Sequence, residues 1–191
     1  NTHLESGVKY ITGDIARLGK DKSVFMVWDG LRVIEVLEMA VSRVDESVNA
    51  INELASKYNV NRSNIIVDED GVGGGVKDYL KCLGFVNNAK PLKIKGKEEN
   101  FSNLKTQCYY RLAEFINRND LYVNCDSKQE RLLSEELEMV RLSKETDANK
   151  ISLLSKDEIK KKIGRSPDYS DALMMRMYYE LNTNKGKYYT G

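Results

Sequence analysis

Short hydrophobic runs separated by polar turns dominate the first forty residues of the chain. β-Branched and aromatic side chains are frequent in these runs, as is typical of strands. The Asp29-Gly30 pair stands between the second and third runs and is a strong signal for a tight hairpin turn. We therefore expect a three-stranded antiparallel meander formed by residues 8–18, 24–28 and 31–37, with a turn at residues 20–22 between the first two strands.

From residue 44 onward, the hydrophobic positions follow helical and extended patterns in alternation. Residues 44–58 carry hydrophobic side chains at helical spacing, which predicts an amphipathic helix. Residues 64–67 end in three apolar β-branched side chains, a composition typical of a central or parallel strand. We expect further helices at 71–83, 103–118, 128–139, 157–163 and 168–181, and short extended pieces at 85–86, 91–94 and 121–123.

Three of these expectations concern local detail. The helix at 71–83 should bury Leu83 and end at Gly84. The helix at 103–118 should begin at a Ser102 or Asn103 cap and turn Phe115 and Ile116 inward. A hairpin is expected within 140–154, with its turn at 147–150. A meander followed by strand–helix alternation predicts an α/β fold with a mixed central sheet and helices on both faces.

The length of the chain indicates one domain, and its basic and acidic residues nearly balance. The chain has 191 residues, 30 basic and 29 acidic, and a net charge of +1. It begins at Asn1 and shows no signal peptide and no apolar run long enough to cross a membrane. We expect a single domain over 1–191 with an ordered core at 8–181, an insertion or flap at 128–165 and a loose tail at 182–191; the first residue suggests an excised fragment.

The few histidines and cysteines exclude several kinds of chemistry. His3 is the single histidine and lies at the terminus, which argues against a histidine-based triad, zinc site or general base. Cys82, Cys108 and Cys125 have no metal-ligand spacing, and we interpret them as reduced thiols. Hydrolytic chemistry in this chain would therefore depend on carboxylates, metal ions or lysines.

Three short stretches place an aspartate at the edge of a hydrophobic run. They are Gly13-Asp14-Ile15-Ala16, the run from Ile65 to Gly71 that contains Asp68 and Asp70, and the run from Ser166 to Leu173 that contains Asp168 and Asp171. An ionised carboxylate beside a core is costly unless a cation or a donor compensates it. Three of them on elements that can converge suggest a site for Mg²⁺ or Mn²⁺, of the kind used in two-metal phosphoryl transfer.

Each acidic stretch also has a simpler interpretation. Asp14 could be a strand residue that faces solvent, and Asp168 could serve the positive end of a helix dipole. The glycines at 71, 73, 74 and 75 could form a flexible turn, or could let a helix begin close to the sheet with its N–H groups open toward an anion. They lack the Gly-Lys-Ser/Thr of a phosphate loop, and Val76 stands where a dinucleotide fingerprint has its last glycine.

At this point the motifs resemble a known family. The order of Gly-Asp-Ile-Ala, Ile-Val-Asp-x-Asp-Gly-Val-Gly-Gly-Gly-Val, Asn-Leu-Lys-Thr-Gln and Arg-Ser-Pro-Asp-Tyr-Ser-Asp-Ala-Leu is similar to the C-terminal nuclease domain of the large terminase subunit of tailed bacteriophages. The resemblance spans residues 8–181 and implies a ribonuclease-H-like fold. The stretch at 17–20 departs from the more glycine-rich turn of many relatives.

The resemblance implies a metal-dependent endodeoxyribonuclease that cuts concatemeric viral DNA during genome packaging. Its metal ligands would be Asp14, Asp68 and Asp171 on two Mg²⁺ or Mn²⁺ ions, with Asp168 secondary and Asp70 weaker. The lysine-rich segments could be solvated faces, or they could hold the DNA backbone. The residues that we predict for DNA contact are Lys93, Lys95, Lys105, Lys160, Lys161, Lys162 and Arg165.

The implied partners are double-stranded DNA, the packaging ATPase domain of the same full-length protein, the portal and the small terminase subunit, in the cytoplasm of an infected bacterium. The chain itself has no phosphate-loop lysine motif, so the motor part is absent from it. Three alternatives stay open. They are another ribonuclease-H-like nuclease such as a Holliday-junction resolvase or a transposase-type core, a non-catalytic DNA-binding or docking domain, and a nucleotide-binding or phosphate-binding module on the glycine turn.

Overall fold

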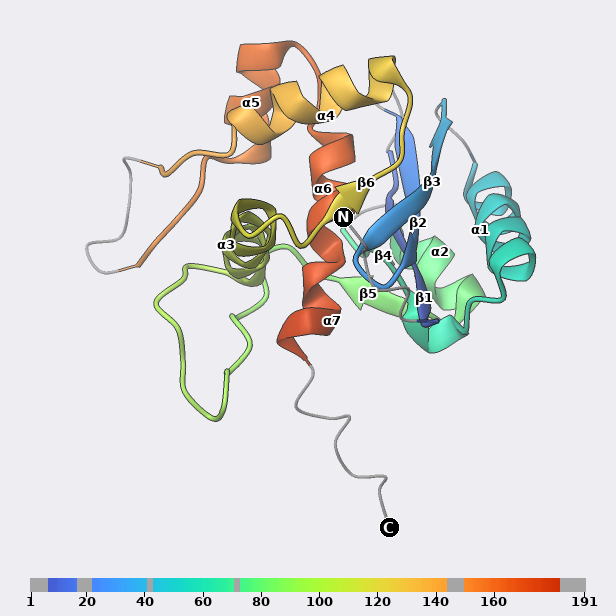
Figure 1. Ribbon diagram of the computed structural model, residues 1–191, viewed down its shortest axis with the longest axis horizontal. Coiled ribbons are helices and arrows are strands. Elements are labelled where there is room, and N and C mark those ends of the chain that lie inside the picture. Colours follow the sequence, from blue (N-terminus) through green and yellow to red (C-terminus); the bar gives the residue numbers. More distant parts are fainter. Residues whose placement is uncertain (1–6, 17–21, 41–42, 71–72, 144–149, 183–191) are drawn as a thin grey trace.

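A six-stranded mixed sheet forms the centre of the protein, in the order β5-β4-β1-β2-β3-β6 (Figure 1). The computed structural model describes residues 7–16, 22–40, 43–70, 73–143 and 150–182. His3, the turn expected at 20–22, the stretch at 17–20, Gly71, the turn expected at 147–150 and the tail lie wholly or largely outside this described part.

The predicted meander is confirmed. β1 (Lys9–Asp14) pairs antiparallel with β2 (Ser23–Asp29), which pairs antiparallel with β3 (Arg32–Met39). Gly30 makes the turn between β2 and β3 with a φ of +60°, a backbone conformation that favours glycine. The first strand is shorter than expected because the Ala16 N–H donates to Ser23 Oγ at 3.1 Å instead of continuing the ladder.

Parallel strands extend the meander on both sides. β4 (Ile65–Asp68) lies beside β1, β5 (Leu83–Phe85) lies beside β4, and β6 (Tyr122–Val123) lies beside β3. Since β1 and β4 run in the same direction, their carboxyl ends meet at one edge of the sheet. In α/β folds, ligands commonly bind at such an edge.

Helices cover both faces of the sheet, as predicted (Figure 1). Helices α1 (Val44–Tyr58) and α2 (Gly73–Leu80) pack on one face, and α3 (Leu104–Asn117), α6 (Asp168–Met175) and α7 (Met177–Leu181) pack on the other. Strand β2 supplies both cores, since Val24, Met26 and Trp28 point to the second face while Phe25 and Val27 point to the first. This alternation is expected of a strand buried on both sides.

The remaining elements lie outside the two layers or connect them. A 3₁₀ turn (Arg62–Asn64) precedes β4, and helices α4 (Ser127–Glu138) and α5 (Lys156–Ile163) lie within the segment predicted to be an insertion. Both helices begin with a capping box, at Asp126 and at Ser155. No helix in the described part of the chain is long and apolar enough to cross a membrane.

Several predicted boundaries are wrong. Helix α2 ends at Leu80, before a left-handed Lys81, and Leu83 and Gly84 belong to strand β5. Ile116 is 39% exposed because the last turn of α3 extends beyond the core. The extended piece expected at 91–94 forms only a bridge between Ile94 and Lys97. The hairpin expected within 140–154 is confirmed as a short antiparallel pairing, with a bridge between Leu142 and Leu153 and a hydrogen bond from the Ser143 N–H to the Ser152 carbonyl at 2.9 Å.

Candidate active site

The three aspartates singled out in the sequence come together at the carboxyl edge of β1 and β4. Asp14 is the last residue of β1 and Asp68 is the last residue of β4, directly after the register pair Gly13–Val67. Asp171 comes from the first turn of α6, which packs on β1. All three are buried, with 2, 8 and 3% of their surface exposed. Asp168, one helical turn before Asp171, is also buried.

Glycine at two positions permits this close arrangement. A Cβ atom on Gly73, the first residue of α2, would lie 1.6 Å from the carbonyl oxygen of Asp68. A Cβ atom on Gly13 would lie 2.7 Å from the Phe25 ring. The expectation that the glycine cluster lets a helix begin close to the sheet is therefore confirmed at Gly73.

Lys156 lies among the carboxylates, a contact that the sequence analysis missed. Its Nζ atom lies 2.9 Å from Asp14 Oδ2, 3.4 Å from Asp171 Oδ2 and 3.7 Å from Asp168 Oδ1. Partial burial opposes its charge, but Asp14, Asp171 and Asp168 together raise the pKa of Lys156 above its ordinary value. The ammonium group is therefore a firmly held positive charge in the centre of the acidic group.

Asp171 is held by two further side chains from α3. Lys105 Nζ donates to Asp171 Oδ2 at 2.9 Å, and the Tyr109 hydroxyl donates to Asp171 Oδ1 at 2.7 Å. Burial disfavours the charged carboxylate, but the ammonium groups of Lys105 and Lys156 outweigh burial and lower the pKa of Asp171. Lys105 was predicted to contact DNA; the structure places it on this carboxylate.

Asp68 has a different environment, with neutral donors. Its Oδ1 atom accepts from the Asp70 N–H at 3.0 Å and from Asn87 Nδ2 at 3.2 Å. Burial, and then the nearby Asp14 carboxylate, raise the pKa of Asp68 to about 7. Asp70 itself is exposed, and its carboxylate accepts from Asn87 Nδ2 at 2.8 Å. Asp70 therefore lies at the rim of the group and not inside it.

The charge and donor chemistry of this group fit a divalent cation. Within the described residues, no three acidic, histidine or cysteine side chains are already arranged as a metal-ligand set. The space between Asp14, Asp168 and Asp171 contains the Lys156 ammonium, a positive charge where a cation would lie. Asp14, Asp168 and Asp171 pair with the ammonium groups of Lys105 and Lys156, and Asp68 adds a fourth buried carboxyl group, so acidic groups outnumber basic ones. Oxygen donors with surplus negative charge are the preferred surroundings of Mg²⁺ and related ions.

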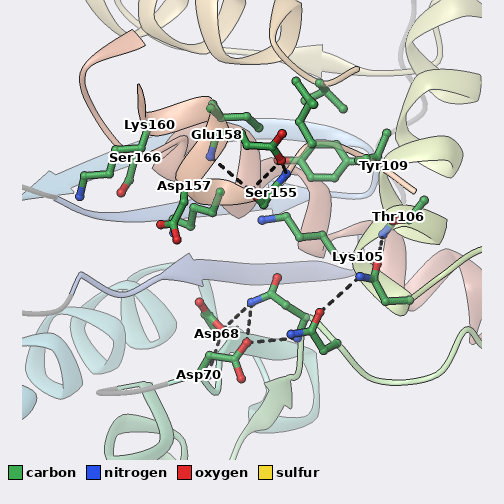
Figure 2. Close-up of a pocket in the computed structure, with 18 of the residues that line it drawn as sticks. Asp68, Asp70, Lys105, Thr106, Tyr109, Ser155, Asp157, Glu158, Lys160 and Ser166 are labelled. Atoms are coloured by element: carbon green, nitrogen blue, oxygen red, sulfur yellow. Dashed lines mark hydrogen bonds between the residues drawn. The ribbon is translucent and has the colours of Figure 1, made fainter. Parts of the chain in front are cut away.

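An open cavity of about 780 Å³ gives access to the carboxylates. Figure 2 shows Asp68 and Asp70 on one side of this cavity and Ser155, Asp157 and Lys160 on the other. Asn87, Asn88, Ser102 and Asn103 add neutral polar groups to the lining. The rim therefore combines neutral hydrogen-bonding groups with the exposed carboxylates of Asp70 and Asp157.

The residues predicted for DNA contact are placed unevenly around the cavity. Lys160 lines it, and Lys161 and Lys162 follow on the exposed surface of α5. Lys93 pairs with Glu98 at 3.3 Å on the exposed loop before α3. Arg165 contacts α4 instead, where its guanidinium pairs with Glu135 at 2.7 Å and with the buried Glu136.

No protein-family model matches the chain, and no curated protein matches it in sequence. Solved structures do match. The nuclease domain of the large terminase subunit of bacterial virus Sf6 superposes with a TM-score of 0.80 at 21–22% identity, over 91% of this chain and 89% of that one. Structures of the Sf6 domain with manganese and with calcium are among the matches.

Large terminase nucleases of two further phages match over similar lengths. That of phage G20c has a TM-score of 0.61 at 18% identity, over 90% of this chain and 81% of that one. The domain of Thermus phage P74-26 has a TM-score of 0.61 at 16% identity, over 90% and 79%. The predicted fold class is thus confirmed: the chain has the ribonuclease-H-like fold of large terminase nuclease domains.

Proposed function

We propose that this chain is a metal-dependent endonuclease that hydrolyses phosphodiester bonds in DNA. The observation that carries the proposal is the meeting of Asp14, Asp68 and Asp171 from three separate elements at one edge of the sheet, buried but open to a cavity. Burying several carboxylates together costs folding free energy, and proteins keep such groups mainly where a cation or a reaction uses them. The likeness to nuclease domains solved with manganese and magnesium supports the same proposal.

In this proposal, Asp14, Asp68 and Asp171 would hold two Mg²⁺ or Mn²⁺ ions. Asp168 has a secondary role, and the exposed Asp70 is the weakest candidate. Bound ions of this kind lower the pKa of an attacking water and stabilise the leaving 3′ oxygen. The chain has no histidine among its described residues, and this chemistry needs none.

The side chains around the acids have distinct tasks. Lys105 and Tyr109 orient Asp171 from α3, so its carboxylate does not depend on an ion for its position. Lys156 compensates the carboxylates before an ion binds, since it contacts Asp14 and Asp171. Asn87 links Asp68 to the rim of the cavity.

The DNA backbone would lie along α5 and the rim of the cavity. Lys160 lines the cavity, and Lys161 and Lys162 extend a basic surface away from it. Lys93 and Lys95 would add charge from the loop before α3. Lysines hold phosphates without reading the base sequence, so binding should be nonspecific and sensitive to salt. We leave Arg165 out of this surface because its contacts hold α4.

The biological setting that fits this activity is the cutting of concatemeric viral DNA during genome packaging. Double-stranded DNA would then be the substrate. The packaging ATPase domain of the same protein, the portal and the small terminase subunit would be its partners in the infected bacterium. The support for this setting is the likeness to terminase nuclease domains over nine tenths of the chain.

Plasmid digestion by the purified chain tests the proposal. Supercoiled plasmid is incubated with EDTA, Mg²⁺ or Mn²⁺, with Asp171→Asn beside the wild type and Asp157→Asn as the matched control. Asp157 lines the same cavity but is exposed and lies outside the acidic group. We expect metal-dependent nicking and linearisation in the wild type and the control, and their loss in Asp171→Asn.

Other outcomes would point to the alternatives. Cutting that is faster on four-way junctions than on linear duplex would favour a resolvase. DNA binding without cutting under any metal condition, together with no heat of Mn²⁺ binding in calorimetry, would favour a docking domain. Saturable ATP binding would favour a phosphate-binding role for the turn before α2.

A further inference from the structure

Close to the candidate site lies a further buried carboxyl group, which does not belong to the set formed by Asp14, Asp68, Asp168 and Asp171. Glu136, near the end of α4, has 0% of its surface exposed. Its Oε2 atom accepts from the backbone N–H of Ser170 at 2.7 Å. Its Oε1 atom pairs with the guanidinium of Arg165. An ionisable side chain buried this completely requires an explanation, because desolvation of its charged form is costly.

The hydrogen bond from Ser170 places Glu136 at a specific point of α6. Ser170 is the third residue of that helix, and first-turn N–H groups have no partner within their own helix. Glu136 supplies that partner from another helix. The N-cap position of α6 is Pro167, whose side chain cannot cap the helix. The Glu136 carboxylate thus acts as the cap that the local sequence lacks.

Ser170 is held from a second direction as well. Its hydroxyl donates to the Pro167 carbonyl at 3.2 Å, and it lies 3.0 Å from the Tyr109 hydroxyl. That same Tyr109 hydroxyl donates to Asp171. A continuous set of short contacts therefore runs from α4 through the first turn of α6 to the Asp171 carboxylate.

We propose that Glu136 is a positioning residue that sets the place of Asp171 through the Ser170 N–H. Groups that orient metal-binding side chains without touching the metal typically change metal affinity by about 10- to 100-fold when they are altered. The inference rests on the proposed function, since it assigns Glu136 a role in presenting a metal-binding carboxylate. Arg165 keeps the Glu136 side chain in place and also reaches the Leu132 carbonyl at 3.1 Å.

Two substitutions separate hydrogen-bond reach from charge. Glu136→Asp keeps the charge near Arg165 but draws the carboxylate back by about 1.5 Å, too far to accept from Ser170. Glu136→Gln keeps the length and an acceptor oxygen for the Ser170 N–H but removes the ionisable group, and with it any negative charge beside Arg165. Glu135→Asp and Glu135→Gln are matched controls, since Glu135 pairs with the same guanidinium from the exposed side of α4.

Mn²⁺ affinity is measured by calorimetry for all five proteins, with the melting temperature in EDTA as a separate measure of stability. We expect Glu136→Asp to weaken Mn²⁺ binding about tenfold, and Glu136→Gln and both controls to stay within about threefold of the wild type. Plasmid cleavage should follow the same order. A purely structural role would lower the melting temperature of both Glu136 variants and leave the Mn²⁺ affinity of the folded proteins unchanged.

The following results would overturn the inference. Unchanged Mn²⁺ affinity in folded Glu136→Asp removes it while the proposed function stands. A larger loss in Glu136→Gln than in Glu136→Asp shows that charge acts instead of reach, and also removes it. Absence of Mn²⁺ binding by the wild type removes the proposed function and this inference together. If Glu136→Asp does not fold, unchanged affinity in a folded Glu136→Ala protein overturns the inference, and a tenfold loss supports it.

Discussion

Lys156 Nζ lies 2.9 Å from Asp14 Oδ2, although the two residues are 142 positions apart in the chain. The contact joins α5 to the end of β1 and brings a positive charge into a group of buried acids. Where no divalent cation is present, this charge limits repulsion among Asp14, Asp168 and Asp171. A divalent cation and the ammonium group would therefore compete for the same carboxylates.

Lys156→Met should make the protein more dependent on divalent cations. Its side chain is 37% exposed, so solvent screening reduces the loss in EDTA to about 1–2 kcal/mol of unfolding free energy. We expect a melting temperature a few degrees lower in EDTA, full recovery with Mn²⁺, and tighter Mn²⁺ binding in calorimetry. Lys162→Met, on the exposed part of the same helix, should behave like the wild type. Weaker Mn²⁺ binding in Lys156→Met would contradict competition and show that the lysine supports the ion.

The stability of the metal-free protein should depend on the charge of Asp68. Its folded-state pKa of about 7 lies above the ordinary value of about 4, so the folded state binds the proton more tightly than the unfolded state. Its contribution is therefore fully present at low pH and is lost as the pH rises through about 7. Burial raises the pKa of Glu136 to about 8, which adds a loss of the same sign.

Asp68→Asn isolates the Asp68 contribution from that of Glu136. In EDTA, we expect the variant to be more stable than the wild type at pH 8, by up to about 2–4 kcal/mol, and nearly equal to it at pH 4. Urea denaturation at the two pH values measures this difference. Equal stability at pH 8 would mean that Asp68 ionises freely in the folded protein. Saturating Mn²⁺ should reverse the order at pH 8, because the charged carboxylate is then compensated.

Gly73→Ala and Gly75→Ala form a matched pair within one helix. A Cβ atom at position 73 would meet the Asp68 carbonyl oxygen at 1.6 Å, whereas one at position 75 would lie 3.6 Å from Val44 in ordinary contact. We expect Gly73→Ala to destabilise the protein by about 1–3 kcal/mol, as overpacking does, and to weaken Mn²⁺ binding by displacing Asp68. Gly75→Ala should stabilise it by up to about 1 kcal/mol through helix propensity. Unchanged stability and Mn²⁺ affinity in Gly73→Ala would show that α2 can shift freely away from the buried carboxylates.

Tyr109→Phe should loosen Asp171 without changing the packing of α3. The substitution removes the hydroxyl that donates to Asp171 at 2.7 Å but keeps the buried ring. A lost hydrogen bond to a charged acceptor costs about 1.5–3 kcal/mol, which should appear in urea denaturation, together with weaker Mn²⁺ binding. Tyr110→Phe is the control, because its ring packs on Phe101 at the surface side of the helix. Equal behaviour of the two variants would mean that Lys105 and Lys156 hold Asp171 without the hydroxyl.

Much of this architecture is predictable because it depends on local pattern. The meander and the helix at 44–58 follow from hydrophobic spacing, and Asp14 and Asp68 attract attention because each ends a run of buried residues. The end of α2 was misjudged because Leu83 fits both the helical stripe and the next strand. Short strands such as β5 take their identity from their neighbours in the sheet, which the local sequence does not contain.

The contacts made by charged side chains were harder to predict. Lys156 and Lys105 fit a basic surface in sequence, but long-range packing directs both to Asp171. Arg165 fits the same surface, but pairs with Glu136. One signal was present: Glu136 follows the buried Leu133 by three residues and so lies on the apolar stripe of α4. A charged residue on such a stripe predicts a buried partner.

Lys160, Lys161 and Lys162 should affect DNA affinity more than they affect metal binding at the buried carboxylates. They lie on α5 beside the cavity, and Lys160 is part of its lining. Changing all three to glutamate should weaken binding of a duplex oligonucleotide and reduce the salt dependence of its affinity, because fewer phosphates are neutralised. Fluorescence anisotropy across a salt series measures both quantities. Mn²⁺ affinity in the absence of DNA is measured beside it, and an unchanged value shows that the loss concerns DNA contact and not the buried carboxylates. The matched control is glutamate at Arg43, Lys57 and Arg62, which lie before, on and after α1 at the opposite face of the sheet. If both triple variants lose DNA affinity equally, net charge explains the effect and α5 is not the DNA surface. If the variant at 160–162 binds DNA as the wild type does, the DNA backbone is held elsewhere along the cavity.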